Sequence, residues 1–153
     1  MKHALTLCIL FSGLLQSASL SAVRGDDVKY IGGTLTVPEK TEGRLDLSDT
    51  KNARFAWHKG EVLIPYEKIT SLEYGQKVGR RVGVAVAVTP LALFSKKRKH
   101  FLTLGFTDDQ GKQQGSVFEL SKGTVRTILS TLEARSGKKV EYESEEAKKN
   151  LGN

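Results

Sequence analysis

Apolar and polar residues alternate along most of the chain after residue 25, which is the pattern of half-buried β-strands. In the stretch NARFAWHKGEVLIPY, residues 52–66, every second residue is apolar on each side of a Lys59-Gly60 turn. A second pair of alternating runs, FLTLGFTDDQGKQQGSVFEL at residues 101–120, surrounds a polar turn at residues 108–111. Two alternating runs joined by a short polar turn predict a β-hairpin, and we expect one in each stretch.

Shorter runs predict the remaining strands. Residues 29–37 form a first strand in which Gly32-Gly33 marks a bend or bulge. Residues 43–47 are either a short strand or a loop. Residues 66–69 form a tight turn, after which residues 70–74 are extended again, and a short extended piece is expected near residues 140–142.

The period of the apolar residues changes near the C-terminus. They fall at i, i+3, i+4 and i+7: Val125, Ile128, Leu129 and Leu132. This stripe predicts an amphipathic helix, with Ser121 as its N-cap and Gly137 just after its last residue. Six or seven strands and one terminal helix predict a mainly β fold with one C-terminal α-helix. We expect a bent antiparallel sheet or partly open barrel, capped by that helix.

Two stretches resemble known proteins. VLIPYEKITSLEYG, residues 62–75, resembles a hairpin and turn of bacterial PH-like and GRAM-like domains. Residues 91–120 and 123–144 resemble small exported bacterial proteins without an assigned function. The resemblance implies a PH-like scaffold that binds lipid headgroups, peptides or proteins. Lys40 and Arg44 stand among acids where phosphoinositide binders of that superfamily carry basic residues, so the resemblance does not extend to phosphoinositide binding.

The first residues have the layout of a secretory signal peptide. A short positive start, Lys2 and His3, precedes an apolar run at residues 4–15 and then small residues. An apolar run of this length is too short to span a bilayer; a buried N-terminal helix is the alternative. We therefore expect a signal peptide at residues 1–25, a PH-like domain at residues 26–143 and a flexible tail at residues 144–153. The protein would be exported, to the periplasm or beyond.

Composition removes several chemistries from consideration. Cys8 is the chain's single cysteine and lies in the predicted signal peptide, so the mature chain has no disulfide or thiol site. His58 and His100 lack metal-ligand spacing, and we expect each in a turn or on the surface. GFTDDQGK, residues 105–112, departs from a phosphate-binding loop, and Asp108-Asp109 fits a turn better than a calcium site. We expect no catalysis, no metal and no cofactor.

One segment stands out by charge. Residues 77–100 contain seven Lys and Arg and no acid, around an apolar run at residues 82–94. The run is too short for a membrane helix, its valines favour a strand, and nucleic acid is not expected for an exported protein. Two interpretations remain: a buried strand at residues 83–88 with solvated charged ends, or an exposed apolar tip with a cationic collar.

On the second interpretation, the protein is an exported, non-catalytic binding module. Residues 79–100 would engage an anionic membrane surface or an acidic protein partner. The candidate binding residues are Arg80, Arg81, Leu91, Leu93, Phe94, Lys96, Lys97, Arg98 and Lys99. The alternative is a carrier of small molecules or lipids, or an enzyme, with a pocket near Trp57, Tyr66 and Tyr74 at the barrel mouth. The sequence leaves the oligomeric state open.

Overall fold

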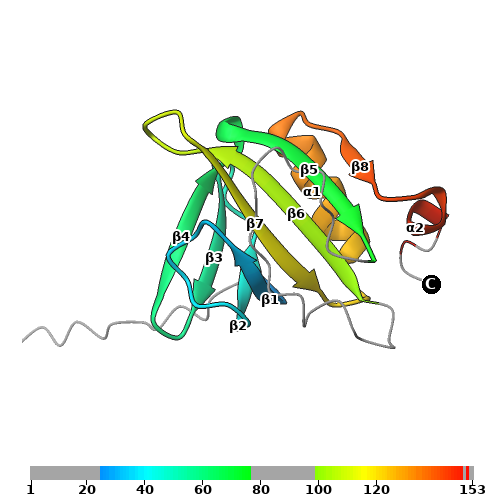
Figure 1. Cartoon of the computed structure of the whole chain (residues 1–153), viewed down its shortest axis with the longest axis horizontal. Coiled ribbons are helices and arrows are strands. Elements are labelled where there is room, and N and C mark those ends of the chain that lie inside the picture. Colours follow the sequence, from blue (N-terminus) through cyan, green and yellow to red (C-terminus); the bar gives the residue numbers. More distant parts are fainter. Residues whose placement is uncertain (1–24, 77–98, 150, 152–153) are drawn as a thin grey trace, which may run out of the picture.

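The computed structural model describes residues 25–76, 99–149 and 151. Eight strands of this part form one sheet, with three helical segments beside it (Figure 1). The elements are, in chain order, β1 (Asp26–Gly33), β2 (Thr41–Asp46), β3 (Asn52–Trp57), β4 (Gly60–Pro65), the 3-10 turn η1 (Tyr66–Lys68), β5 (Ile69–Gly75), β6 (His100–Thr107), β7 (Gln113–Leu120), α1 (Val125–Ser136), β8 (Val140–Tyr142) and α2 (Glu145–Lys149).

The strand order is β4-β3-β2-β1-β7-β6-β5-β8. Strands β1 to β4 form one antiparallel meander and β5 to β7 form another, and the antiparallel pairing of β1 with β7 joins them. At the far end, β8 pairs with β5 in parallel. The sheet is bent and not closed into a barrel, so the predicted mainly β fold with a C-terminal helix is confirmed (Figure 1).

Alternation places one side chain of every two on the core face of the sheet. Leu72 and Tyr74 on β5, and Leu102 and Leu104 on β6, are fully buried and belong to one core cluster. Where the two meanders meet, the rings of Tyr30, Phe55 and Phe118 pack together, with centroids 5.2 to 6.3 Å apart. Each such side chain stabilises the fold by about 1.5–3 kcal/mol through burial.

Helix α1 covers this core face. Its buried residues are those of the predicted stripe: Val125, Ile128, Leu129 and Leu132. Gly137 ends the helix in the left-handed conformation, with φ 69°, as predicted. The prediction of Ser121 as N-cap is wrong: the helix begins after Thr124, and the Ser121 hydroxyl donates instead to the carbonyl of Asp27 at 3.2 Å. Ser121 is within hydrogen-bonding distance of the first strand because β1 lies beside the end of β7.

Several local predictions are confirmed, including the extended piece at residues 140–142 and the turn at residues 66–69. A bulge interrupts the β1–β7 ladder between Tyr30 and Gly32, where the sequence predicts one. Gly33 follows it with φ +141°, and a Cβ there would lie 2.2 Å from the carbonyl oxygen of Gly115. Only glycine fits this crossing without strain. In the segment expected as a tail, residues 145–149 form α2.

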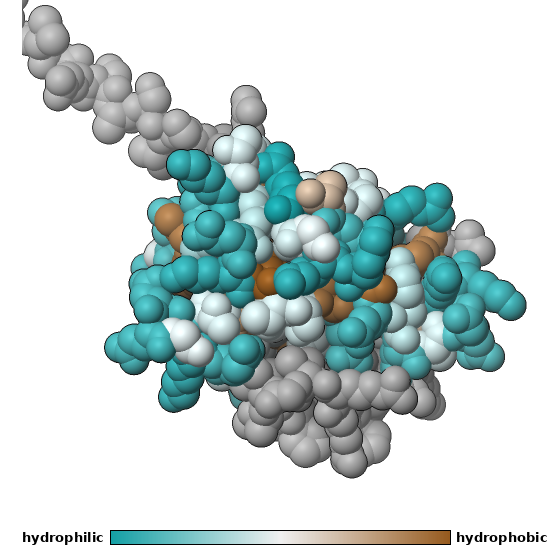
Figure 2. All heavy atoms as spheres, turned by 90° about the horizontal axis from the view of Figure 1, so that it is seen from above, coloured by the Kyte–Doolittle hydropathy of each residue, from teal (hydrophilic) through white to brown (hydrophobic). Residues whose placement is uncertain are grey.

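Polar side chains cover most of the surface seen in Figure 2, with a few apolar residues between them. No helix in the described part of the chain is long and apolar enough to cross a membrane.

Candidate functional site

The candidate binding segment is attached where β5 ends and β6 begins. Of its candidate residues, Arg80, Arg81, Leu91, Leu93, Phe94, Lys96, Lys97 and Arg98 lie outside the described residues. The apolar run at residues 82–94 also lies outside them, as does the predicted signal peptide up to residue 24. Lys99 is described. The structure therefore shows the end of β5 at Gly75 and the start of β6 at His100, which the segment connects. We call these two strand ends the platform.

Both ends of the segment meet on neighbouring strands. Gly75 on β5 stands directly opposite Phe101 on β6 in the antiparallel register. A residue five positions from this pair is within about 18 Å of it even when the chain is fully extended. The two ends of the segment are therefore attached at the same end of the sheet, and the basic residues 80–81 and 96–99 lie close to these attachment points in the sequence, some 15 residues from one another.

Lys99 is held by an ion pair at this platform. Its Nζ lies 2.8 Å from Oε2 of Glu119 on β7, and the two side chains are 34% and 24% exposed. A partly exposed pair of this kind contributes about 0.2–1 kcal/mol to stability. The pair fixes the last residue before β6, so one cation of the predicted collar is already neutralised by the protein itself.

His100, the next residue, is buried. Its side chain is 6% exposed, its Nδ1 lies 2.6 Å from the hydroxyl of Tyr74, and the two rings stack with centroids 6.0 Å apart. Burial, and then the cation of Lys122, lower the pKa of His100 below its usual value. Burial, and then Tyr142, raise the pKa of Tyr74. The imidazole and the Tyr74 hydroxyl therefore share a buried hydrogen bond.

The expectation of a turn or surface position is wrong for His100 and correct for His58, which is exposed in the turn between β3 and β4. His100 shares its parity with Leu102 and Leu104, and this parity places it on the core face of β6. The same alternation that predicts the strand could have predicted the burial of its first residue.

On the other side of the platform, β8 secures the end of β5. The backbone N–H of Gln76 donates to Oε2 of Glu143 at 2.9 Å, and the N–H of Glu143 donates to the carbonyl of Tyr74 at 2.9 Å. The ring of Tyr142 packs edge-on against Tyr74, 6.0 Å between centroids. The segment therefore leaves a strand end that is fixed from both sides.

The aromatic residues of the alternative pocket have separate surroundings. Tyr66 and Tyr74 are 2% and 0% exposed and belong to the core cluster. Trp57 stacks on Phe55, 5.7 Å between centroids, while Tyr66 lies under the guanidinium of Arg135, 5.5 Å from its ring centroid. These three aromatic side chains pack against different partners, so each contributes to a different part of the core.

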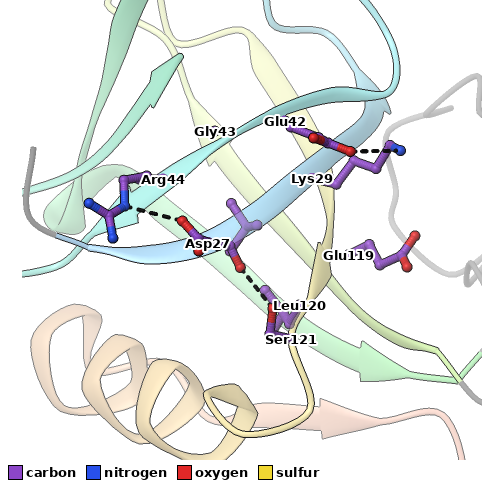
Figure 3. A pocket seen from close by; sticks show the side chains of 9 residues that line it. Asp27, Lys29, Glu42, Gly43, Arg44, Glu119, Leu120 and Ser121 are labelled. Carbon is purple, nitrogen blue, oxygen red and sulfur yellow. Dashed lines mark hydrogen bonds and ion pairs between the residues drawn. The ribbon is translucent and has the colours of Figure 1, made fainter. Parts of the chain in front are cut away.

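A polar depression of about 610 Å³ lies over β1, β2 and the end of β7 (Figure 3). Its charged groups form cross-strand pairs: Lys29 Nζ lies 3.5 Å from Glu42 Oε1, and Arg44 Nε lies 3.2 Å from Asp27 Oδ1. Glu119, also in its lining, is paired with Lys99. Because acids and bases neutralise one another here, this depression has little net charge with which to attract an ion.

A second depression, of about 630 Å³, lies between η1, the β2–β3 loop and the end of α1. Arg135 in its lining already donates to the carbonyl of Asp49. The Asp49 carboxylate accepts from the backbone N–H groups of Lys51 and Asn52, which lowers its pKa. The polar groups here hold the loop in place.

The turn at residues 108–111 is built as the sequence predicts. The Asp108 carboxylate accepts hydrogen bonds from the N–H groups of Gln110 and Lys112 and from the Gln114 amide, while Asp109 pairs with Lys68. The backbone bond from Lys112 is the main cause of the lowered pKa of Asp108. Within residues 25–76 and 99–149, no three His, Cys, Asp or Glu side chains gather as metal ligands do.

No protein-family model matches this sequence, and a search of curated proteins finds no match either.

Proposed function

We propose that the protein is an exported, non-catalytic binding module that engages an anionic membrane surface through residues 79–100. An acidic protein partner is the other class that this chemistry fits. The domain is proposed to be PH-like, the scaffold implied by the sequence resemblance. The observation that supports the proposal is the pairing of Gly75 with Phe101, because both ends of the segment that carries the two basic clusters are attached at this one end of the sheet.

The membrane is favoured over the acidic protein by the apolar residues between these clusters. Leu91, Leu93 and Phe94 follow Pro90, and only Ser95 separates them from the second basic cluster. An apolar tip can enter the acyl boundary while the flanking cations pair with lipid headgroups. An acidic protein surface would use the same cations and would have less use for the apolar tip.

Vesicle sedimentation tests the proposal directly. We expect the mature protein to sediment with vesicles that contain about 30% anionic lipid, and to be released as salt is raised. Neutral vesicles should leave it in solution. Replacing Lys96, Lys97 and Arg98 together by Gln should weaken binding about 100-fold, because each basic residue near the surface contributes about 1 kcal/mol.

A matched control removes three exposed lysines elsewhere. Lys112, Lys138 and Lys139 are exposed on the β6–β7 turn and after α1, and their replacement by Gln should leave vesicle binding within a factor of about three. Equal losses in the two triple variants would show that only total charge matters and would refute a localised site. Absence of binding to every vesicle at low salt would leave the acidic partner.

Export is tested separately from binding. We expect the protein recovered outside the cytoplasm to have lost the predicted signal peptide, with its new N-terminus close to residue 26. N-terminal sequencing or intact mass reads this out, and an intact Met1 in an exported product would contradict it.

A further inference from the structure

Strand β4 is an outer strand of the described sheet. It pairs with β3 along its whole length in an unbroken antiparallel register, and the strand order of the described part places no strand on its other side (Figure 1). Leu63, in the middle of this edge, is 53% exposed, and no other large apolar side chain among the described residues is exposed. An open strand edge with an apolar residue at its centre is a surface that another strand can join.

The register shows which backbone groups line this edge. Opposed residues of an antiparallel pair alternate between those that exchange two hydrogen bonds and those that exchange none. The N–H of Tyr66 donates to the carbonyl of Lys51 at 2.8 Å, one step beyond the β3–β4 ladder. Even-numbered residues of β4 therefore bond to β3, and the N–H and C=O groups of Glu61 and Leu63 point away from the sheet. Pro65 also points outward, where its missing N–H costs the β3 ladder nothing and leaves a carbonyl on the edge.

We propose that two copies of the chain pair along this edge, with β4 of each copy antiparallel to β4 of the other. In a two-fold pair centred on Leu63, the Leu63 N–H of each copy donates to the Leu63 carbonyl of the other. The Glu61 N–H of each copy donates to the Pro65 carbonyl of the other. This register satisfies all four outward N–H groups of Glu61 and Leu63 in the two copies, and it requires of Pro65 only an acceptor.

The side chains fit the same register. The two Leu63 side chains lie opposite each other at the two-fold axis and cover one another on the outer face. On the core face, Val62, which packs partly buried against the core cluster, lies opposite Ile64 of the other copy. Lys59, just before β4, falls opposite Glu67 of the other copy, just after it. Both are exposed, and neither makes an ion pair with another described residue.

This self-complementarity favours a second copy over an unrelated strand. A two-fold contact requires that one surface patch match itself, and here apolar groups meet apolar groups while Lys59 meets Glu67. The edge has few of the features that keep strand edges apart. Its register with β3 has no bulge, and Glu61, the one charged residue within β4, lies 3.5 Å from Arg54 on β3. Because both copies use the same edge, the pair closes and leaves no β4 edge for a third copy.

The self-association of the mature protein tests the proposal. One short strand per copy buries less than a standard interface of about 1,600 Å², so the dimer is weak. In sedimentation velocity we expect a monomer at about 1 µM and a weight-average mass that approaches twice the monomer mass at about 500 µM. A mass that stays that of the monomer over this range would overturn the proposal and leave the edge to a strand of another protein.

A variant at the centre of the edge locates the contact. Leu63→Lys removes the apolar contact and places two cations opposite each other, so it should weaken association at least about 30-fold. Because the side chain is exposed, the urea midpoint should stay close to that of the wild type. Thr127→Lys adds the same charge on the exposed face of α1 and should change association by no more than about threefold. Undiminished association of Leu63→Lys would overturn the proposal.

A charge exchange tests the register itself. Lys59→Glu places two carboxylates opposite each other at both ends of the pair and should weaken association about five- to tenfold. Adding Glu67→Lys restores opposite charges and should recover most of this loss. A double variant no stronger than Lys59→Glu would overturn the antiparallel pairing of β4. These variants lie outside residues 79–100, so this inference and the proposed membrane function can fail separately.

Discussion

Lowering the pH should destabilise the protein through His100. The imidazole is buried, shares a hydrogen bond with the Tyr74 hydroxyl and lies near the cation of Lys122. A second proton on the ring would place a charge in the core. The folded state therefore resists a proton that the unfolded chain accepts readily.

The sign of the pH dependence, and the pH range in which it acts, follow from the lowered pKa of His100, whose usual value is 6.5. At pH above 6.5 neither state binds the proton, and the stability is fully present. As the pH falls below 6.5, the unfolded chain binds a proton that the folded chain does not. The free energy of unfolding then falls by up to about 1.4 kcal/mol per pH unit. The loss ends only when the pH reaches the lowered pKa of the folded state.

Urea unfolding followed by Trp57 fluorescence measures this between pH 7.5 and 5. Carboxyl groups with lowered pKa, such as Asp46 and Asp108, have usual values of 3.8 and act only at lower pH. His100→Gln should be less stable at pH 7.5 but should lose the slope, while His58→Gln in the exposed turn should keep it. Equal slopes for the wild type and His100→Gln would refute the reasoning.

Two further predictions concern packing and backbone geometry. Leu132→Ala should lower the free energy of unfolding by about 2–5 kcal/mol, because Leu132 is fully buried under the sheet. The control Leu63→Ala, at a residue 53% exposed, should change the free energy of unfolding by less than about 1 kcal/mol. Equal urea midpoints for the two variants would contradict the position of α1. Gly33→Ala should lower the free energy of unfolding by at least about 1–3 kcal/mol, because its Cβ would collide with the carbonyl of Gly115. The Cβ of Gly123→Ala would meet nothing within 4 Å, so this control should leave the stability unchanged. Thermal melts of the two variants measure the difference.

Hairpins and the helix could be predicted because their signals are local. The turn at residues 108–111 and the stripe that begins at Val125 each lie within one short window of sequence. The join of β1 with β7 and the parallel pairing of β5 with β8 bring together residues far apart in the chain. No periodicity encodes such partners, and the Ser121 cap failed for this reason, since its hydroxyl bonds to β1.

The platform was only partly predictable. Alternation could have placed His100 in the core, but its partner Tyr74 lies 26 residues away across the hairpin. The sequence shows the charge of residues 79–100 plainly. The ion-pair partners of these basic residues depend on the register of three strands. Glu119 becomes the partner of Lys99 only when β6 and β7 align.

The pairing of β1 with β7 also implies an order of folding, in which the two meanders form before the joint between them closes. Val28 pairs with Leu120, so the first strand of the domain has one of its two neighbours near the end of the sheet-forming sequence. The meanders β1–β4 and β5–β7 can each form from nearby residues, but the joint between them closes a loop of more than eighty residues. Such closure is slow compared with hairpin formation. A chain emerging from its N-terminus would thus carry an unpaired β1 edge until β7 arrives, and a chain truncated before residue 113 would keep that edge permanently, open to pairing with other chains.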